Sequence, residues 1–221
     1  MEPVAEPIAI ALPKGRILEE ALPLLARAGI DLEGLVADAG RRLLLPTPLG
    51  GRVLLVKPVD VPTYVEHGIA DLGIAGLDTL AEEDRDLYEP VDLGIGACRL
   101  VVAEPVDRPW IRRPGAELRV ATKYPRLALR HYRARGIQAR VIQLFGSVEL
   151  GAVTGLADQI VDLVESGETL RQNHLREVET ILKVTSRLIV HPASLKLKRA
   201  RIEGLIDALR DAVDPALTRT A

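Results

Sequence analysis

The sequence contains very few of the residues that mark several common classes of protein. Cysteine, methionine, tryptophan and phenylalanine each occur once among 221 residues, and aromatic residues make up only 3%. The single cysteine, Cys98, excludes a disulfide framework and a cysteine-rich zinc site. No apolar run approaches the roughly 20 residues that span a bilayer, and the first residues lack the basic and then apolar pattern of a signal peptide. We therefore expect a cytoplasmic protein with no membrane partner.

Charge of one sign is not in excess either. Lysine and arginine total 29 against 31 aspartate and glutamate residues, which leaves a net charge of −2. A nucleic-acid-binding protein normally has a basic excess, so we expect no nucleic-acid partner. The four histidines show no metal-ligand spacing, and no Gly-x-x-x-x-Gly-Lys-Ser/Thr motif is present. The sequence therefore predicts no certain metal site, and any ATP is expected to bind outside a P-loop.

Apolar periodicity predicts an α/β protein. Short apolar segments bounded by glycine or proline alternate with segments of helical period, as expected for largely buried parallel strands. The pattern forms two sets of similar size, which indicates two lobes, and ligands in such folds bind at the carboxyl ends of strands. We expect the site in the cleft between the lobes. Three further predictions are a loop or boundary over 104–115, one extended segment over 177–190, and a helix from Ala193 onward.

The segment between Glu149 and Leu170 is the most informative one. It contains Ser166-Gly167-x-Thr169 after an apolar strand. Gly167 permits a tight turn, so backbone N–H groups and both hydroxyls can converge on one anion at a helix N-terminus. The same pattern also fits a simple capped turn, in which a hydroxyl satisfies helix-start N–H groups.

Carboxylates precede that turn. Asp162 and Glu165 cannot bind a phosphate, but they can accept hydrogen bonds from neighbouring sugar hydroxyls. Glu149 can reach a ribose hydroxyl or a water bound to Mg²⁺, which keeps much of its hydration. Together with the turn, these residues predict a ribose-5-phosphate pocket.

An ordered set of residues in this segment resembles the signature of the ATP phosphoribosyltransferase family, which starts histidine biosynthesis: Glu149, Gly155, Ala157, Ile160, Asp162, Ser166, Gly167, Thr169 and Leu170. Further stretches are similar to the same family at 12–16, 60–68, 70–76, 121–124 and 186–190. The resemblance departs at His174, where glycine is frequent, and at Gly151-Ala152-Val153, which replaces a stretch bearing Ala-Pro. Neither departure touches Ser166-Gly167-x-Thr169.

The resemblance implies a fold and a reaction. The fold is two-lobed and like the type II periplasmic binding proteins, with residues 1–97 and about 186–221 in one lobe and about 98–185 in the other. In the reaction, N1 of the adenine of ATP attacks C1 of phosphoribosyl pyrophosphate and releases pyrophosphate, with Mg²⁺ as cofactor. The residues expected to bind phosphoribosyl pyrophosphate are Glu149, Asp162, Glu165, Ser166, Gly167, Glu168, Thr169 and Leu170.

Two arginines and three other residues complete the predicted site. Arg16 follows a strand end and a glycine at a helix start, where a cation gains nothing from the helix dipole. Arg16 is therefore the first catalytic candidate for the leaving group. The resemblance implies Arg41 as the second, since it matches another arginine of the family, although Arg41 and Arg42 also fit a solvated surface pair. The nucleotide-binding candidates are Lys14, Lys123 and Tyr124, and a packed surface tyrosine explains Tyr124 equally well.

The resemblance also implies partners. The length matches the short form of the family, a catalytic subunit that works with a regulatory subunit similar to histidyl-tRNA synthetase. A homodimer within a hetero-oligomer is therefore expected. Two alternatives stay open: a non-catalytic protein of the same two-lobed fold that binds a small ligand, and an inactive paralogue.

Overall fold

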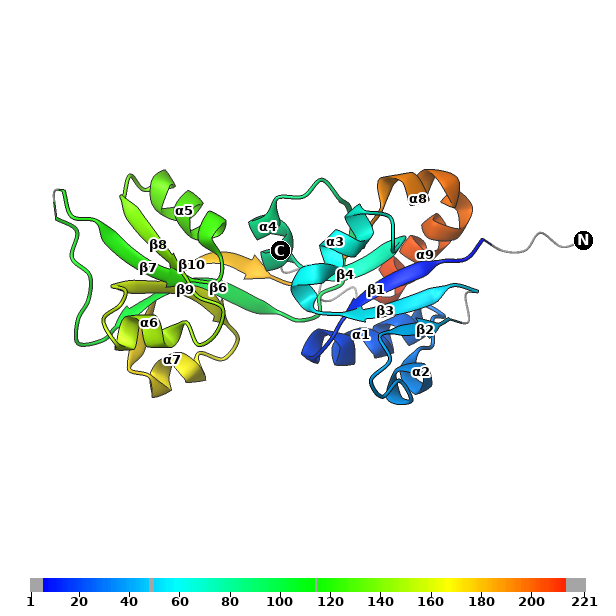
Figure 1. Cartoon of the computed structure of the whole chain (residues 1–221), viewed down its shortest axis with the longest axis horizontal. Coiled ribbons are helices and arrows are strands. Elements are labelled where there is room, and N and C mark those ends of the chain that lie inside the picture. The colour runs from blue at the N-terminus through cyan, green and yellow to red at the C-terminus, as the bar shows by residue number, and fades with distance from the viewer. Residues whose placement is uncertain (1–5, 48–49, 114, 214–221) are drawn as a thin grey trace, which may run out of the picture. The chain divides into compact units, whose positions relative to one another are not determined.

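The computed structural model describes residues 6–47, 50–113 and 115–213. The chain divides into two compact units (Figure 1). Of the described residues, unit 1 contains those of 6–80, 84–96 and 185–213, and unit 2 contains 81–83 and 97–184. Nowhere in the described ranges is a helix long and apolar enough to cross a membrane.

Unit 1 is built on a six-stranded sheet with the order β2-β3-β1-β4-β11-β5. The strand β1 pairs in parallel with β3 and β4, whereas β2, β11 and β5 run antiparallel to their neighbours. The strands span β1 (Ala9–Pro13), β2 (Leu44–Pro46), β3 (Arg52–Val56), β4 (Leu72–Gly76), β5 (Tyr88–Asp92) and β11 (Ser186–Val190).

Helices cover both faces of this sheet. On one face, α1 (Arg16–Arg27) buries Leu18, Leu24 and Leu25 in the same apolar cluster as residues of α9 (Arg199–Ala212). On the other face, α3 (Val61–Glu66) and the first part of α4 (Leu77–Glu83) pack against β1, β4 and β11. The remaining helices are α2 (Glu33–Ala37), the 3₁₀ turn η1 (Pro58–Asp60) and α8 (Pro192–Leu197).

Unit 2 has a five-stranded sheet with the order β10-β6-β9-β7-β8. The strands β9, β7 and β8 are parallel and form one side of the sheet, whereas β6 runs antiparallel to both β9 and β10. The strands span β6 (Cys98–Pro105), β7 (Leu118–Thr122), β8 (Ala139–Gln143), β9 (Gln159–Val164) and β10 (Leu175–Val184).

Alternation along β6 shows how this sheet is buried on both faces. Val101 and Ala103 join the cluster that contains residues of α6 (Glu149–Val153) and α7 (Glu168–Gln172), whereas Leu100 and Val102 join the cluster on the α5 (Pro125–Ala134) side. Neighbouring residues of a strand point to opposite faces, so a continuous apolar run fills both layers. Figure 1 shows α5 on one side of this sheet and α6 and α7 on the other.

The α/β prediction is confirmed, but four details of the sequence analysis are wrong. The sheets are mixed rather than parallel throughout. The first two residues of the expected loop over 104–115 belong to β6, where Arg176 of β10 pairs with the charge of Glu104 and the buried amide of Gln159 donates to it. The extended segment 177–190 is two strands, β10 and β11, which belong to different sheets. The C-terminal helix is broken at Lys198, whose ammonium binds the carboxylate of Asp71 and the carbonyl of Pro7.

Candidate functional site

A cavity of about 250 Å³ lies in unit 2, at the end of β9. The end of this strand, the turn that follows it, α7 and the first residue of α6 supply its walls. The lining residues include every residue that the sequence predicts for phosphoribosyl pyrophosphate: Glu149, Asp162, Leu163, Val164, Glu165, Ser166, Gly167, Glu168, Thr169 and Leu170. The structure therefore brings this predicted group together.

The turn between β9 and α7 contributes backbone N–H groups to the lining of the cavity. Gly167 has a φ of 79°, a left-handed conformation that favours glycine, and it begins α7. The Ser166 hydroxyl accepts a hydrogen bond from the N–H of Glu168 at 3.3 Å. Within the described ranges, no hydrogen bond engages the N–H groups of Gly167, Thr169 and Leu170 or the Thr169 hydroxyl. Ser166 thus forms a weak cap, and the other donors remain available to an anion.

Asp162 and Glu149 form an acidic pair in this cavity. Asp162 is nearly buried, with 13% of its side chain exposed, and its Oδ2 lies 3.9 Å from Nζ of Lys123. Burial raises the pKa of Asp162 above its usual value, and the negative charge of Glu149 acts in the same direction. Lys123 and the N–H of Leu163, which donates to Oδ1 at 2.9 Å, oppose that rise. Lys123 and the N–H of Leu163 are thus the two groups that favour the charged form of Asp162 against burial and Glu149.

The carboxylate of Glu168, which also lines the cavity, already has hydrogen-bond partners. Glu168 accepts hydrogen bonds from Arg171 and from Gln172, and Arg171 holds the pKa of Glu168 below its ordinary value. The cavity is thus lined by four carboxylates and, among the described residues, by no basic side chain. An anionic ligand there needs cations from the rim or cations that arrive with it.

Glu149 reaches the cavity because α6 packs closely on the sheet. A Cβ at Gly151 would lie 2.6 Å from the Cβ of Ala121, so only glycine allows this approach. The sequence analysis did not predict α6, which has only five residues. The pair of small residues Gly151 and Ala152, both buried, was the available signal.

Lys123 and Tyr124 follow β7 directly. Tyr124 is half-buried and packs against the apolar cluster of α5, as the packed-tyrosine interpretation expects. Lys123 is exposed and faces Asp162. The N-terminus of α5 does not offer an anion site, because the carboxylate of Glu82 accepts the N–H groups of Arg126 and Leu127 at 2.8 and 2.9 Å.

Lys14, Arg16 and Arg41 belong to unit 1. Lys14 and Arg16 follow β1 and are exposed, and Arg16 is the first residue of α1. Nε of Arg16 lies 3.8 Å from Oε1 of Glu20, whose other oxygen accepts the N–H of Gly96 at 2.7 Å. The sequence analysis did not identify Glu20, which lies one helical turn after Arg16.

The structure separates the two neighbouring arginines of unit 1. Arg42 binds the carbonyls of Ala39 and Asp38, at 3.3 and 2.7 Å, and so closes the end of α2. Arg41 is exposed and makes no hydrogen bond or ion pair with any residue in the described part of the chain. The carbonyl of Leu43 accepts a hydrogen bond from the N–H of Leu55 on β3. The segment that contains Arg41 therefore reaches the carboxyl ends of β3 and β1, and Arg16 lies shortly after the end of β1.

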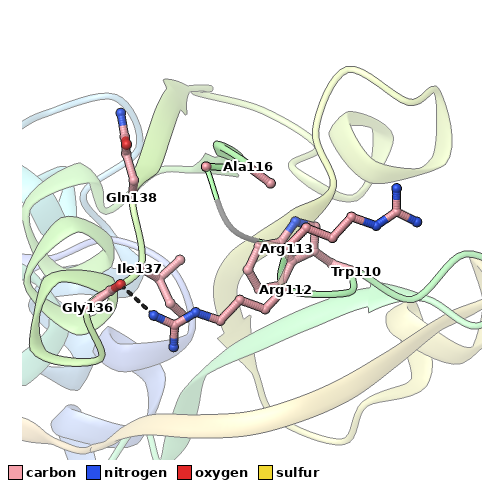
Figure 2. A pocket seen from close by; sticks show the side chains of 8 residues that line it. Trp110, Arg112, Arg113, Ala116, Gly136, Ile137 and Gln138 are labelled. Carbon is pink, nitrogen blue, oxygen red and sulfur yellow. Dashed lines mark hydrogen bonds between the residues drawn. The ribbon is translucent and has the colours of Figure 1, made fainter.

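A larger cavity of about 510 Å³ lies elsewhere in unit 2 (Figure 2). Trp110, Arg112 and Arg113 line it together with Gly136 and neighbouring residues. Arg112 donates to the carbonyl of Gly136 at 2.8 Å, and Figure 2 shows that Arg113 extends in the opposite direction. The two guanidinium groups do not converge on one point, so this cavity lacks the arrangement that a phosphate requires.

Across the described residues, no group of three or more histidine, cysteine, aspartate or glutamate side chains is placed to hold a metal ion. Glu149 and Asp162 are two carboxylates only. Such a pair suits a hydrated Mg²⁺ that is bound mainly by substrate oxygens.

Comparisons with known proteins identify the family of the chain. The family model of ATP phosphoribosyltransferase matches residues 57–211. An ATP phosphoribosyltransferase from Citrifermentans bemidjiense is 49% identical over 208 residues, which cover 93% of this chain and 98% of the relative. The chain also resembles a chain of the ATP phosphoribosyl transferase (HisG:HisZ) complex from Thermotoga maritima, with a TM-score of 0.79, 33% identity and coverage of 93% and 98%.

A likeness to a substrate-binding protein of an amino acid ABC transporter extends to the fold alone. Its TM-score is 0.56 at 12% identity, with 93% of this chain and 91% of the other covered. The expected likeness to periplasmic binding proteins is thereby confirmed.

Proposed function

The chain belongs to the ATP phosphoribosyltransferase family, and we propose that the cavity of unit 2 is where it holds phosphoribosyl pyrophosphate. The family catalyses the first step of histidine biosynthesis, the transfer of the phosphoribosyl group to N1 of the adenine of ATP. The observation that carries the proposal is the set of unengaged N–H groups and the Thr169 hydroxyl beside the acidic pair Glu149 and Asp162.

The two ends of the sugar phosphate need different partners. The 5-phosphate accepts hydrogen bonds from the N–H groups of Gly167, Thr169 and Leu170 and from the hydroxyls of Ser166 and Thr169. The ribose hydroxyls donate to carboxylate oxygens of Asp162 or Glu149, which act only as acceptors when the group is ionised and so do not compete as donors. Fixing both ends orients C1 toward the attacking base, which is the main catalytic work in such a transfer.

The leaving group requires positive charge. We assign that work to Arg16 and Arg41, because a guanidinium binds phosphate oxygens with two parallel hydrogen bonds. Both side chains are exposed. Arg16 follows the carboxyl end of β1, and Arg41 precedes β2 in a segment that reaches the carboxyl end of β3. Adenine N1 carries its own lone pair, so no general base is needed. We assign Lys14 and Tyr124 to the nucleotide.

Mg²⁺ is the proposed cofactor. The donor set fits a hydrated ion, since Glu149 and Asp162 supply carboxylates and the substrate supplies phosphate oxygens. When bound, the ion neutralises charge that develops on the departing pyrophosphate. The reaction uses metabolites of the cell interior, which supports a cytoplasmic location.

We also propose a regulatory partner. The resemblance to a chain of the HisG:HisZ complex supports assembly with a regulatory subunit that is similar to histidyl-tRNA synthetase. A homodimer within that hetero-oligomer is the proposed state. Sedimentation of the chain with and without such a subunit measures both.

Calorimetric titration of the chain with phosphoribosyl pyrophosphate and Mg²⁺ tests the pocket. We expect saturable binding that is lost in a Ser166→Ala/Thr169→Ala double variant. Thr154→Ala is the matched control, since the Thr154 hydroxyl binds the carbonyl of Leu150 at the end of α6 and lies outside the cavity lining. Equal binding by the double variant and the control would reject the pocket.

Release of pyrophosphate from ATP and phosphoribosyl pyrophosphate, measured with the regulatory subunit present, separates the enzyme from a binding protein of the same fold. We expect release that requires both substrates. Binding without release in the complete assembly would favour a non-catalytic protein.

A further inference from the structure

Thr122, the last residue of β7, is fully buried at the edge of the acidic cavity. Its hydroxyl donates a hydrogen bond to the carbonyl of Val161 on β9 at 2.6 Å and accepts one from the N–H of Tyr124 at 2.8 Å. One side chain therefore ties the end of β7 to the neighbouring strand and to the start of α5. Both bonds flank Lys123, whose backbone they fix from either side.

The strand register then determines what Lys123 faces. Thr122 pairs with Val161 in the parallel ladder, so Lys123 is level with Asp162. The observed separation of 3.9 Å between Nζ of Lys123 and Oδ2 of Asp162 follows from this register. Lys123 thus lies at the rim of a cavity whose walls carry four carboxylates and no described basic side chain.

Phosphoribosyl pyrophosphate is strongly anionic, and a wall of carboxylates repels it. A cation at the rim reduces that repulsion. Arg171 does not serve this purpose, because it is engaged with Glu168. Lys123 is the cation placed for it.

We propose that Lys123 serves the sugar-phosphate pocket rather than the nucleotide, and that Thr122 is the positioning residue that holds it beside Asp162. The inference rests on the proposed function of the cavity. It changes the expected role of Lys123 and adds Thr122, which the sequence analysis did not select.

The charges around Asp162 agree in sign with this role. Glu149 on α6 lies in the same cavity and raises the pKa of Asp162, and Glu165 and Glu168 line the cavity further along the turn. Val101, the partner of Asp162 on β6, is apolar. Lys123 is the one side-chain cation found to lower the pKa of Asp162 within the described chain, so its removal is expected to raise that pKa further.

Four substitutions test the proposal. Thr122→Val keeps the volume but removes both hydrogen bonds, Thr122→Ser keeps the hydroxyl, Lys123→Gln removes the charge, and Lys123→Arg keeps the charge. The affinities for phosphoribosyl pyrophosphate with Mg²⁺ and, separately, for ATP are measured by calorimetry. We expect Thr122→Val to weaken the binding of phosphoribosyl pyrophosphate roughly three- to tenfold, which is the loss of affinity that corresponds to about one hydrogen bond.

We expect Lys123→Gln to weaken the binding of phosphoribosyl pyrophosphate at least as much. Thr122→Ser and Lys123→Arg are expected to retain wild-type affinity, and ATP affinity is expected to stay unchanged throughout. A purely structural role for Thr122 would weaken the binding of both ligands. Lys123 is exposed, so its variants remain informative even where Thr122→Val lowers stability.

The outcomes separate the two proposals. Failure of the wild-type chain to bind phosphoribosyl pyrophosphate would overturn the proposed pocket and this inference together. Binding that is lost in Ser166→Ala/Thr169→Ala but is unaffected in Lys123→Gln would overturn this inference alone. If Lys123→Gln weakens the binding of ATP and leaves the binding of phosphoribosyl pyrophosphate unchanged, Lys123 contacts the nucleotide instead.

Discussion

The phenolic hydroxyl of Tyr132 on α5 donates a hydrogen bond to Oε1 of Gln159 on β9 at 2.8 Å, and both side chains are buried. The amide of Gln159 in turn donates to Glu104 on β6 at 2.8 Å. Glu104 also accepts hydrogen bonds from the guanidinium of Arg176 on β10 and from the N–H of Trp110. A continuous polar network thus joins α5 to three strands of unit 2.

Tyr132→Phe is expected to lower the free energy of unfolding of unit 2 by about 1–3 kcal/mol. The substitution leaves Oε1 of Gln159 buried without its donor, and an unsatisfied buried acceptor costs more than the hydrogen bond itself contributes. Urea unfolding followed by circular dichroism measures the change. Tyr88→Phe is the matched control, because Tyr88 is 47% exposed. Equal effects of the two substitutions would contradict the network's role.

Arg16→Ala is expected to reduce kcat by about a hundredfold, the usual cost of removing one donor that stabilises developing charge. The free energy of unfolding should change by less than about 0.5 kcal/mol, because the contact with Glu20 is exposed. Steady-state kinetics in the presence of the regulatory subunit and thermal melting provide the two readouts. Arg199→Ala, at an exposed ion pair of α9, controls for loss of a surface arginine. Unchanged turnover would remove Arg16 from the mechanism.

Arg41 and Arg42 should give opposite results. Arg41→Ala is expected to reduce kcat/KM by at least about tenfold, the loss of one charge-assisted hydrogen bond, and to leave stability unchanged. Arg42→Ala is expected to lower stability by about 1 kcal/mol, because it exposes the carbonyls at the end of α2. Kinetics and thermal melting of both variants check the pair. A stable and inactive Arg42→Ala protein would reverse the assignment.

Acid should destabilise unit 2 in part through Asp158. Arg119 donates to both oxygens of this carboxylate, at 2.7 and 3.1 Å, and holds the pKa of Asp158 below its ordinary value of 3.8. A carboxyl group with a lower pKa in the folded state contributes its stability above the unfolded pKa, and that contribution is lost as the pH falls below about 4. Unfolding midpoints between pH 7 and pH 3 should therefore fall more steeply for the wild-type chain than for Asp158→Asn. Parallel curves would exclude this carboxylate as a source of the acid sensitivity.

The sequence alone determined the elements that rest on local patterns. The strand at Ala9–Pro13, the helix that begins at Arg16, and the turn at Ser166–Gly167 were predictable, because apolar periodicity and a glycine at a left-handed position act over a few residues. The ordered motif from Glu149 to Leu170 was also sufficient to suggest the family.

Tertiary structure decided which charged residues matter and what they face. Glu104 resembles a loop residue in the sequence, yet it is 3% exposed, because Arg176 of β10 pairs with its charge and Gln159 of β9 donates a hydrogen bond to it. Arg41 and Arg42 are adjacent and cannot be told apart in the sequence. In the structure, only Arg42 binds the carbonyls at the end of α2. Lys123 faces Asp162 because two strands 39 residues apart share one register, fixed by the Thr122 hydroxyl. Such pairings depend on contacts between distant segments, and local propensity and spacing carry no information about them.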